Sequence, residues 1–178
     1  MNAGRAGLIA ALIACLPPEG LAQPIAASTL KAAFVVNFVK FTEWPTRKPE
    51  LPILLCVFGD EILSNALITV VGSQRVDNRA IQVMRLLPDG PVHNCQVLFV
   101  AEREPRRFAA KLSEAGPFPV LTVSDTEDAA ENGAIVEFFL ENDRLRFAVN
   151  VDAMDRSRVK VSSRLLTLAR IVRDKPMP

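Results

Sequence analysis

The chain has 178 residues, of which 49% are hydrophobic and 23% are charged, and this composition argues for one folded domain and against a disordered body. The formal net charge is +1. Because binding a nucleic-acid backbone needs a basic excess, the charge argues against nucleic acid as a partner.

Charge is nevertheless uneven in the second half of the chain. Residues 113–145 carry eight acidic side chains and one basic one, whereas residues 151–178 carry seven basic and three acidic side chains. Two interpretations stay open. The segments form two solvated faces, or they are complementary in charge to a partner or to a second copy of the chain.

Residues 1–22 have the organisation of a secretory signal peptide. Arg5 supplies the positive charge, and residues 8–16 form an apolar run of nine, which is too short to anchor a protein stably in a bilayer. The small residues that follow predict cleavage between Ala22 and Gln23. We therefore expect the mature protein to be exported.

A second interpretation of the N-terminus stays open. Residues 12–15, LIAC, resemble a bacterial lipobox. Cleavage before Cys15 would leave a lipid-modified N-terminus tethered to a membrane.

The first predicted element of the mature chain is an apolar helix over residues 30–45, which Ser28 can cap and Pro45 ends. Its apolar face is formed at helical spacing by Leu30, Phe34, Phe38 and Phe41. A helix this apolar must be buried against something. The helix has more apolar residues than one buried face needs. We expect the additional ones, at Val35 and Val39, to form a dimer or partner surface together with the last helix.

Strands and helices then alternate. Buried strands are predicted at residues 53–58, 96–101 and 119–124, and a less buried strand at 79–87. Helices are predicted at residues 60–71, 104–115 and, as a short acidic helix, 125–132. Residues 135–140 and 144–149 flank a polar turn and predict an antiparallel hairpin.

The chain is predicted to end in a helix that Ser162 or Ser163 caps. Its buried stripe would comprise Leu165, Leu168, Ala169 and Val172. Alternating strands and helices predict a single α/β domain over residues 28–175, with a mixed, largely parallel sheet. Helices should flank the sheet on both faces, and the antiparallel hairpin should lie near the C-terminus.

No residue pattern predicts catalysis. Neither standard glycine-rich phosphate loop is present, and His93, the only histidine, lies in a predicted turn. Asp125 and Asp128 fit the start of a helix, Ser162 fits a cap, and Trp44 fits a plug at a helix end better than a ligand platform. We therefore predict no catalytic residues, no metal site and no cofactor.

Cys56 and Cys95 remain if Cys15 leaves with the signal peptide. An even number of cysteines in an exported chain favours a disulfide. Buried free thiols stay open as an alternative, as does a metal or redox role, although the chain has no C-x-x-C motif and a single histidine.

Four blocks, in this order and spacing, carry a specific pattern over nearly the whole mature chain. They are LKAAFVVNFVKFTEWP at 30–45, CVFGD at 56–60, NCQVLFV at 94–100, and a last block from LTVSD at 121–125 through the hairpin to RFAVNVDAMDRSRVKVSSRLLTLA at 146–169. Together they resemble the YfiR-like family of bacterial periplasmic proteins.

The resemblance implies an α/β domain that tends to dimerise, with a disulfide between Cys56 and Cys95. A second cysteine pair of some members is missing, so redox tuning through that pair is not implied. The family is known for a regulator that restrains an inner-membrane diguanylate cyclase and that an outer-membrane lipoprotein can sequester.

What the resemblance implies is thus a non-enzymatic regulator of cyclic-di-GMP signalling, and so of biofilm formation. It would bind the periplasmic sensor domain of an inner-membrane diguanylate cyclase or sensor kinase. A periplasmic small-molecule binding module is the alternative, with a pocket expected at the carboxyl ends of the strands.

Overall fold

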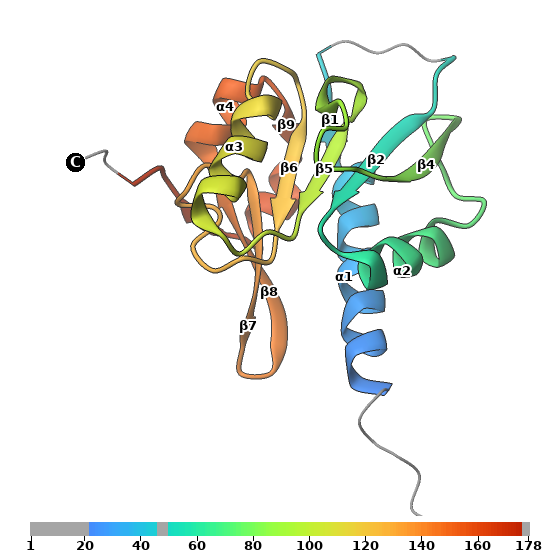
Figure 1. Ribbon diagram of the computed structural model, residues 1–178, viewed down its shortest axis with the longest axis horizontal. Helices are drawn as coiled ribbons and strands as arrows, with labels where there is room; N and C mark the ends of the chain where they lie inside the picture. The colour runs from blue at the N-terminus through green and yellow to red at the C-terminus, as the bar shows by residue number, and fades with distance from the viewer. Residues whose placement is uncertain (1–21, 46–49, 176–178) are drawn as a thin grey trace, which may run out of the picture.

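The computed structural model describes residues 22–45 and 50–175. Most of the predicted signal peptide lies outside these residues, so cleavage after Ala22 and a lipid on Cys15 stay predictions. An eight-stranded sheet in the order β10-β8-β7-β6-β5-β2-β4-β3 organises the described chain (Figure 1).

The sheet is largely parallel. Its strands are β2 (Ile53–Phe58), β3 (Arg75–Val76), β4 (Arg79–Arg85), β5 (Val97–Val100), β6 (Leu121–Ser124), β7 (Val136–Glu141), β8 (Arg144–Asn150) and β10 (Arg170–Val172). Strands β4, β2, β5, β6 and β7 pair in parallel, and β10 pairs in parallel with β8. Strands β7 and β8 pair antiparallel through a turn in which Asn142 and Asp143 both have positive φ. The predicted sheet and hairpin are confirmed.

The helices are α1 (Ala22–Lys40), α2 (Glu61–Val71), α3 (Pro105–Ala115), α4 (Val151–Ser157) and α5 (Ser163–Leu166), with a 3₁₀ turn η1 (Val92–Asn94). Carboxylates cap two of them. Asp60 accepts a hydrogen bond from the Leu63 amide at 2.8 Å, and Glu104 accepts one from the Arg107 amide at 2.8 Å.

Both faces of the sheet are buried, because successive side chains of a strand point to opposite sides. In β2, Ile53, Leu55 and Val57 belong to a core that includes α1 and α2. Cys56 and Phe58 belong to a second core that includes α3. The predicted helical cover on both faces is therefore confirmed.

Aromatic contacts join the first helix to the hairpin. Phe38 of α1 meets Phe147 of β8 edge to face, with ring centres 5.1 Å apart, and meets Phe138 of β7 at 6.0 Å. Phe34 contacts the same two rings at 5.9 and 6.2 Å. Such pairs contribute about 0.5–1.5 kcal/mol each beyond the area they bury.

The predicted bounds of the first helix are wrong at both ends. Helix α1 begins before Ser28, which is buried within it and does not cap it. It ends at Lys40, because residues Thr42–Glu43 form β1, which pairs antiparallel with β9 (Lys160–Val161) in a separate two-stranded sheet. Of the predicted apolar face, Phe38 is buried whereas Leu30 and Phe41 are partly exposed.

The predicted last helix is also wrong. Ser162 does cap a helix, accepting a hydrogen bond from the Arg164 amide at 3.3 Å, but α5 has only four residues. The chain then extends into β10, because β8 still has an unpaired edge whose backbone groups need partners. Leu168, predicted to be buried, is 70% exposed.

Residues 125–132 form turns and not the predicted acidic helix. The Ala130 amide donates to the buried carboxylate of Glu137 at 3.0 Å, and Asp128 adopts a positive φ of 57°. Glu137 of β7 thus accepts a hydrogen bond from a backbone amide that would donate to a backbone carbonyl in the predicted helix.

We predict that Phe38→Ala lowers the free energy of unfolding by about 3–5 kcal/mol, because the ring is buried among aromatic partners that cannot collapse into the space. Urea denaturation monitored by circular dichroism measures the change. Phe41→Ala is the matched control, because Phe41 follows directly on the end of α1 and is 39% exposed. An equal loss in both variants would contradict the assignment of Phe38 to the core.

Candidate functional site

A disulfide joins Cys56 of β2 to Cys95, which lies just before β5. Their Cα atoms are 5.9 Å apart, an ordinary separation for such a bond, and both residues are buried. Burial in the α3-side core gives the disulfide a structural role, since it fixes two neighbouring parallel strands.

The residues considered for catalysis do not come together. His93 is exposed on η1 with its ring 5.9 Å from that of Phe118. Asp125 forms an ion pair with Lys31 of α1, while Asp128 pairs with Lys175 at 3.0 Å. In the part of the chain that the structure describes, no group of three or more His, Cys, Asp or Glu side chains could hold a metal ion.

Trp44 and the two valines proposed for an interaction surface lie inside the fold. Trp44 is buried, and its indole nitrogen donates to the Gln96 carbonyl oxygen at 3.1 Å, which agrees with a plug. Val35 and Val39 are 0% exposed. The prediction of a docking surface at these valines is therefore corrected, because they are used to bury the sheet.

The carboxyl ends of the central strands form the edge where α/β sheets usually bind ligands, beside the switch in strand order between β2 and β5. Two hollows of about 190 and 770 Å³ share Arg103, Asp125 and Thr126 here. Gly59 is required beside them, because a Cβ atom there would lie 2.4 Å from the Ala101 carbonyl oxygen. The expected hollow is present at this edge.

Electrostatics make this edge a poor anion site. The N-termini of α2 and α3 open here, but each is already capped by a carboxylate, from Asp60 and Glu104. A capping carboxylate takes up the amide donors and the positive end of the helix dipole that an anion would otherwise use.

An exposed apolar surface lies where the hairpin leaves the body. Leu140 and Leu145 are cross-strand partners that continue the face of Phe138 and Phe147, and Leu140 is 74% exposed. Leu30, one turn before Phe34 on α1, is 48% exposed. In Figure 1 the hairpin and the N-terminal half of α1 project in the same direction. We call Leu30, Phe34, Leu140 and Leu145 the hairpin surface.

The sequence analysis missed the hairpin surface. Leu140 looked like one more inward position of an alternating strand, and alternation alone does not say where a strand passes beyond the body. The signal that was available is its place two residues before the Asn142-Asp143 turn.

The last described residues, 170–175, form what we call the C-terminal strap. Arg173 pairs with Asp152, Asp174 pairs with Arg156, and Lys175 pairs with Asp128 and Glu131. Part of the charge complementarity between the acidic and basic segments is thus satisfied within the chain.

Hydrogen bonding shifts the titration of the strap. The Arg156 guanidinium lowers the pKa of the Asp174 carboxyl below its ordinary value of 3.8, and Asp174 in turn raises the pKa of Arg156. Hydrogen bonds to Asp128 and Glu131 raise the pKa of Lys175.

The model of the protein family described as YfiR/HmsC-like matches residues 28–170. The match spans most of the chain, so the chain belongs to this family, which is regulatory rather than catalytic and indicates a periplasmic regulator of cyclic-di-GMP signalling. The disulfide is consistent with that compartment. Among the described residues, no helix is both long and apolar enough to cross a bilayer.

We predict that the double variant Cys56→Ala/Cys95→Ala loses about 4 kcal/mol of stability, the chain-entropy value for a loop closed across a sequence separation of 39. Urea denaturation of the variant and of the oxidised protein measures the difference. Dithiothreitol should lower the stability of the native protein and leave that of the double variant unchanged. A stability loss with dithiothreitol in both proteins would contradict this origin.

We also predict that the C-terminal strap contributes less to the free energy of unfolding in acid. A carboxyl whose folded pKa is lowered stabilises the fold above its unfolded pKa, and the contribution disappears as the pH falls through the lower folded pKa. Between about pH 5 and about pH 2.5, the native protein should lose more stability than Asp174→Asn does. The prediction would be contradicted if the free energy of unfolding fell equally with pH in the two proteins.

Proposed function

We propose that the protein is a non-enzymatic regulator that binds the periplasmic sensor domain of an inner-membrane diguanylate cyclase, with a sensor kinase as the alternative partner. Family membership over residues 28–170 supports the class of function. The observation that carries the docking site is the hairpin surface, because it places a 74% exposed leucine on a protruding strand beside a rigid aromatic core.

A surface of this kind suits protein docking. Its centre is apolar and its support is rigid, since Phe34 and Leu145 pack against the core. Arg144 and Glu141 are exposed cross-strand partners at the end of the hairpin and give the apolar centre a charged rim. Such an arrangement is typical of interfaces between proteins.

Regulation would follow from differential binding. A regulator shifts a sensor toward its inactive state only by the difference between its affinities for the two states. Sequestration by an outer-membrane lipoprotein would then release the sensor by mass action. The proposal includes a homodimer as the binding species.

We predict that Leu140→Asp abolishes restraint of the cyclase, because a charge replaces the apolar centre of the interface. The measurement is cyclic-di-GMP in a deletion strain complemented with each variant, alongside binding of purified protein to the cyclase's periplasmic domain. Leu87→Asp is the matched control, since Leu87 is 73% exposed away from the hairpin.

The variant should give the cyclic-di-GMP level of the deletion strain and lose binding by about a hundredfold, the effect of a hot-spot residue. The control should match the native protein, and both variants should keep the native melting temperature. Full restraint by Leu140→Asp would exclude the hairpin surface. Unchanged cyclic-di-GMP in the deletion strain would exclude the cyclase as the partner.

A further inference from the structure

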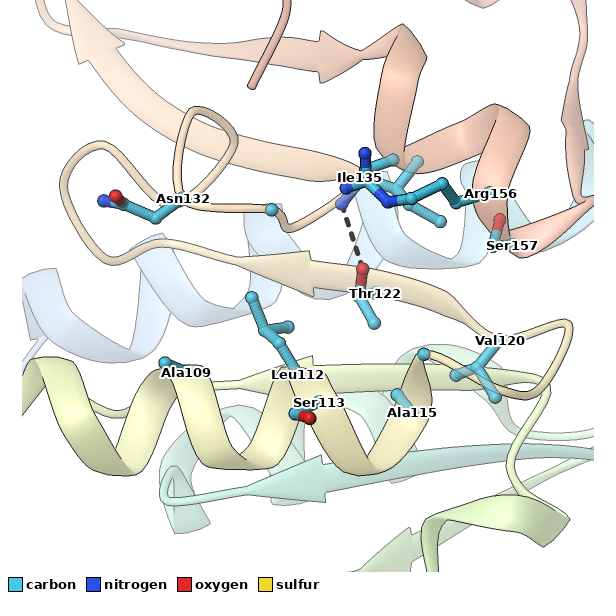
Figure 2. Close-up of a pocket in the computed structure, with 13 residues that line it drawn as sticks. Ala109, Leu112, Ser113, Ala115, Val120, Thr122, Asn132, Ile135, Arg156 and Ser157 are labelled. Atoms are coloured by element: carbon cyan, nitrogen blue, oxygen red, sulfur yellow. Dashed lines mark hydrogen bonds between the residues drawn. The ribbon is translucent and has the colours of Figure 1, made fainter. Parts of the chain in front are cut away.

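A separate cavity lies between α3 and α4, above the middle of β6 (Figure 2). Its volume is about 340 Å³, and its walls include Ala109, Leu112, Thr122, Ile135, Ala153 and Arg156. None of these residues belongs to the hairpin surface. The volume falls at the small end of the range of about 300–1,000 Å³ that is usual for small-molecule sites.

Small side chains keep this cavity open. Ala109 and Ala115 of α3, Ala153 of α4, and Gly116 and Gly133 are among the residues that line it. Leu112 and Ile135 supply larger apolar walls, and Figure 2 shows Leu112 pointing from α3 toward the space below Ile135. The walls therefore suit an apolar body.

Thr122 is one of the buried hydroxyl residues that line the cavity. Thr122 is 6% exposed, and its hydroxyl oxygen accepts a hydrogen bond from the Ile135 amide at 2.9 Å. A hydroxyl can accept one hydrogen bond and donate another at the same time. A ligand oxygen placed in the cavity could therefore accept a hydrogen bond from the Thr122 hydroxyl.

A cation stands at the rim. Figure 2 shows the Arg156 side chain reaching across Ile135, and its two terminal nitrogens both donate to the carboxylate of Asp174 in the C-terminal strap. The guanidinium is permanently charged, and its planar fork matches a carboxylate. The rim arginine is thus already holding the chemical group that an anionic ligand would present.

A competing carboxylate can reach Arg156. The Arg156 and Asp174 side chains are 56% and 34% exposed, so their ion pair is open to water and to a ligand. Asp174 would not be left alone, because it also accepts a hydrogen bond from the buried Asn150 amide at 2.8 Å. A ligand could therefore recruit Arg156 while Asp174 keeps its second partner.

We propose that this cavity binds a small monocarboxylate with one apolar ring or branched chain, the carboxylate on Arg156 and an oxygen within reach of the Thr122 hydroxyl. The apolar walls account for the body of the ligand, and the rim cation accounts for its charge. The inference concerns the protein alone and does not rest on the hairpin surface or its partner.

Titration calorimetry of the exported chain with phenylacetate tests the proposal, and phenylacetamide serves as the uncharged isostere. Phenylacetate should bind at least about tenfold more tightly than the amide, which corresponds to one charge-assisted hydrogen bond. Arg156→Gln should weaken phenylacetate binding about tenfold, and Arg158→Gln, an exposed arginine outside the cavity, should not change it.

A second pair of variants tests the location. Ala109 and Ala110 are both exposed on α3, but only Ala109 lines the cavity. Ala109→Phe should abolish binding by filling the space, whereas Ala110→Phe should bind like the native protein. Absence of phenylacetate binding at millimolar concentration would overturn the proposal. So would equal binding by Ala109→Phe and Ala110→Phe, or by Arg156→Gln and the native protein.

Discussion

The packing of α1 against the hairpin is the contact on which the structure most depends. Phe34 and Phe38 come from the start of the described chain, and Phe138 and Phe147 come from two strands at least 100 residues later. Their rings close one core over the sheet and hold the base of the hairpin rigid. Without α1, the inner face of β7 and β8 would be exposed to water, and no other described helix offers aromatic partners there.

The packing of α1 against the hairpin explains which surfaces are buried and which remain accessible to a partner. The large apolar side chains in the second half of α1 are buried in the core, whereas Leu30 is exposed and Phe34 is partly exposed beside the projecting hairpin. The edge of the sheet where α/β enzymes bind substrates is occupied by carboxylate caps and by the Lys31–Asp125 pair. A regulator that acts by docking fits this distribution better than a protein that acts on an anionic substrate.

Local patterns predicted the elements whose cause is local. The strand at β2 follows from a continuous apolar run, and the hairpin follows from alternation around a polar turn. The sequence-based errors occur where distant groups compete for the backbone. Residues 125–132 lose a helical hydrogen bond to Glu137, and residues 170–172 join the free edge of β8. The hairpin surface and the position of Arg156 at the cavity rim could not be predicted either. Both depend on how β8 and α4 are placed against the rest of the fold, which the local sequence does not specify.

The sequence by itself determined the α/β class, the burial of the sheet on both faces, the pairing of Cys56 with Cys95 through the family resemblance, and the family. These properties follow from the spacing of apolar residues, from the residues at turns and from the order of the four sequence blocks, all of which can be read directly from the sequence. Only the tertiary structure decided that Val35 and Val39 are core, that residues 170–175 form a strap, and that Thr122 and Arg156 line one cavity. The physical reason is that exposure and ion pairing depend on neighbours brought together by packing, and no local pattern encodes their identity.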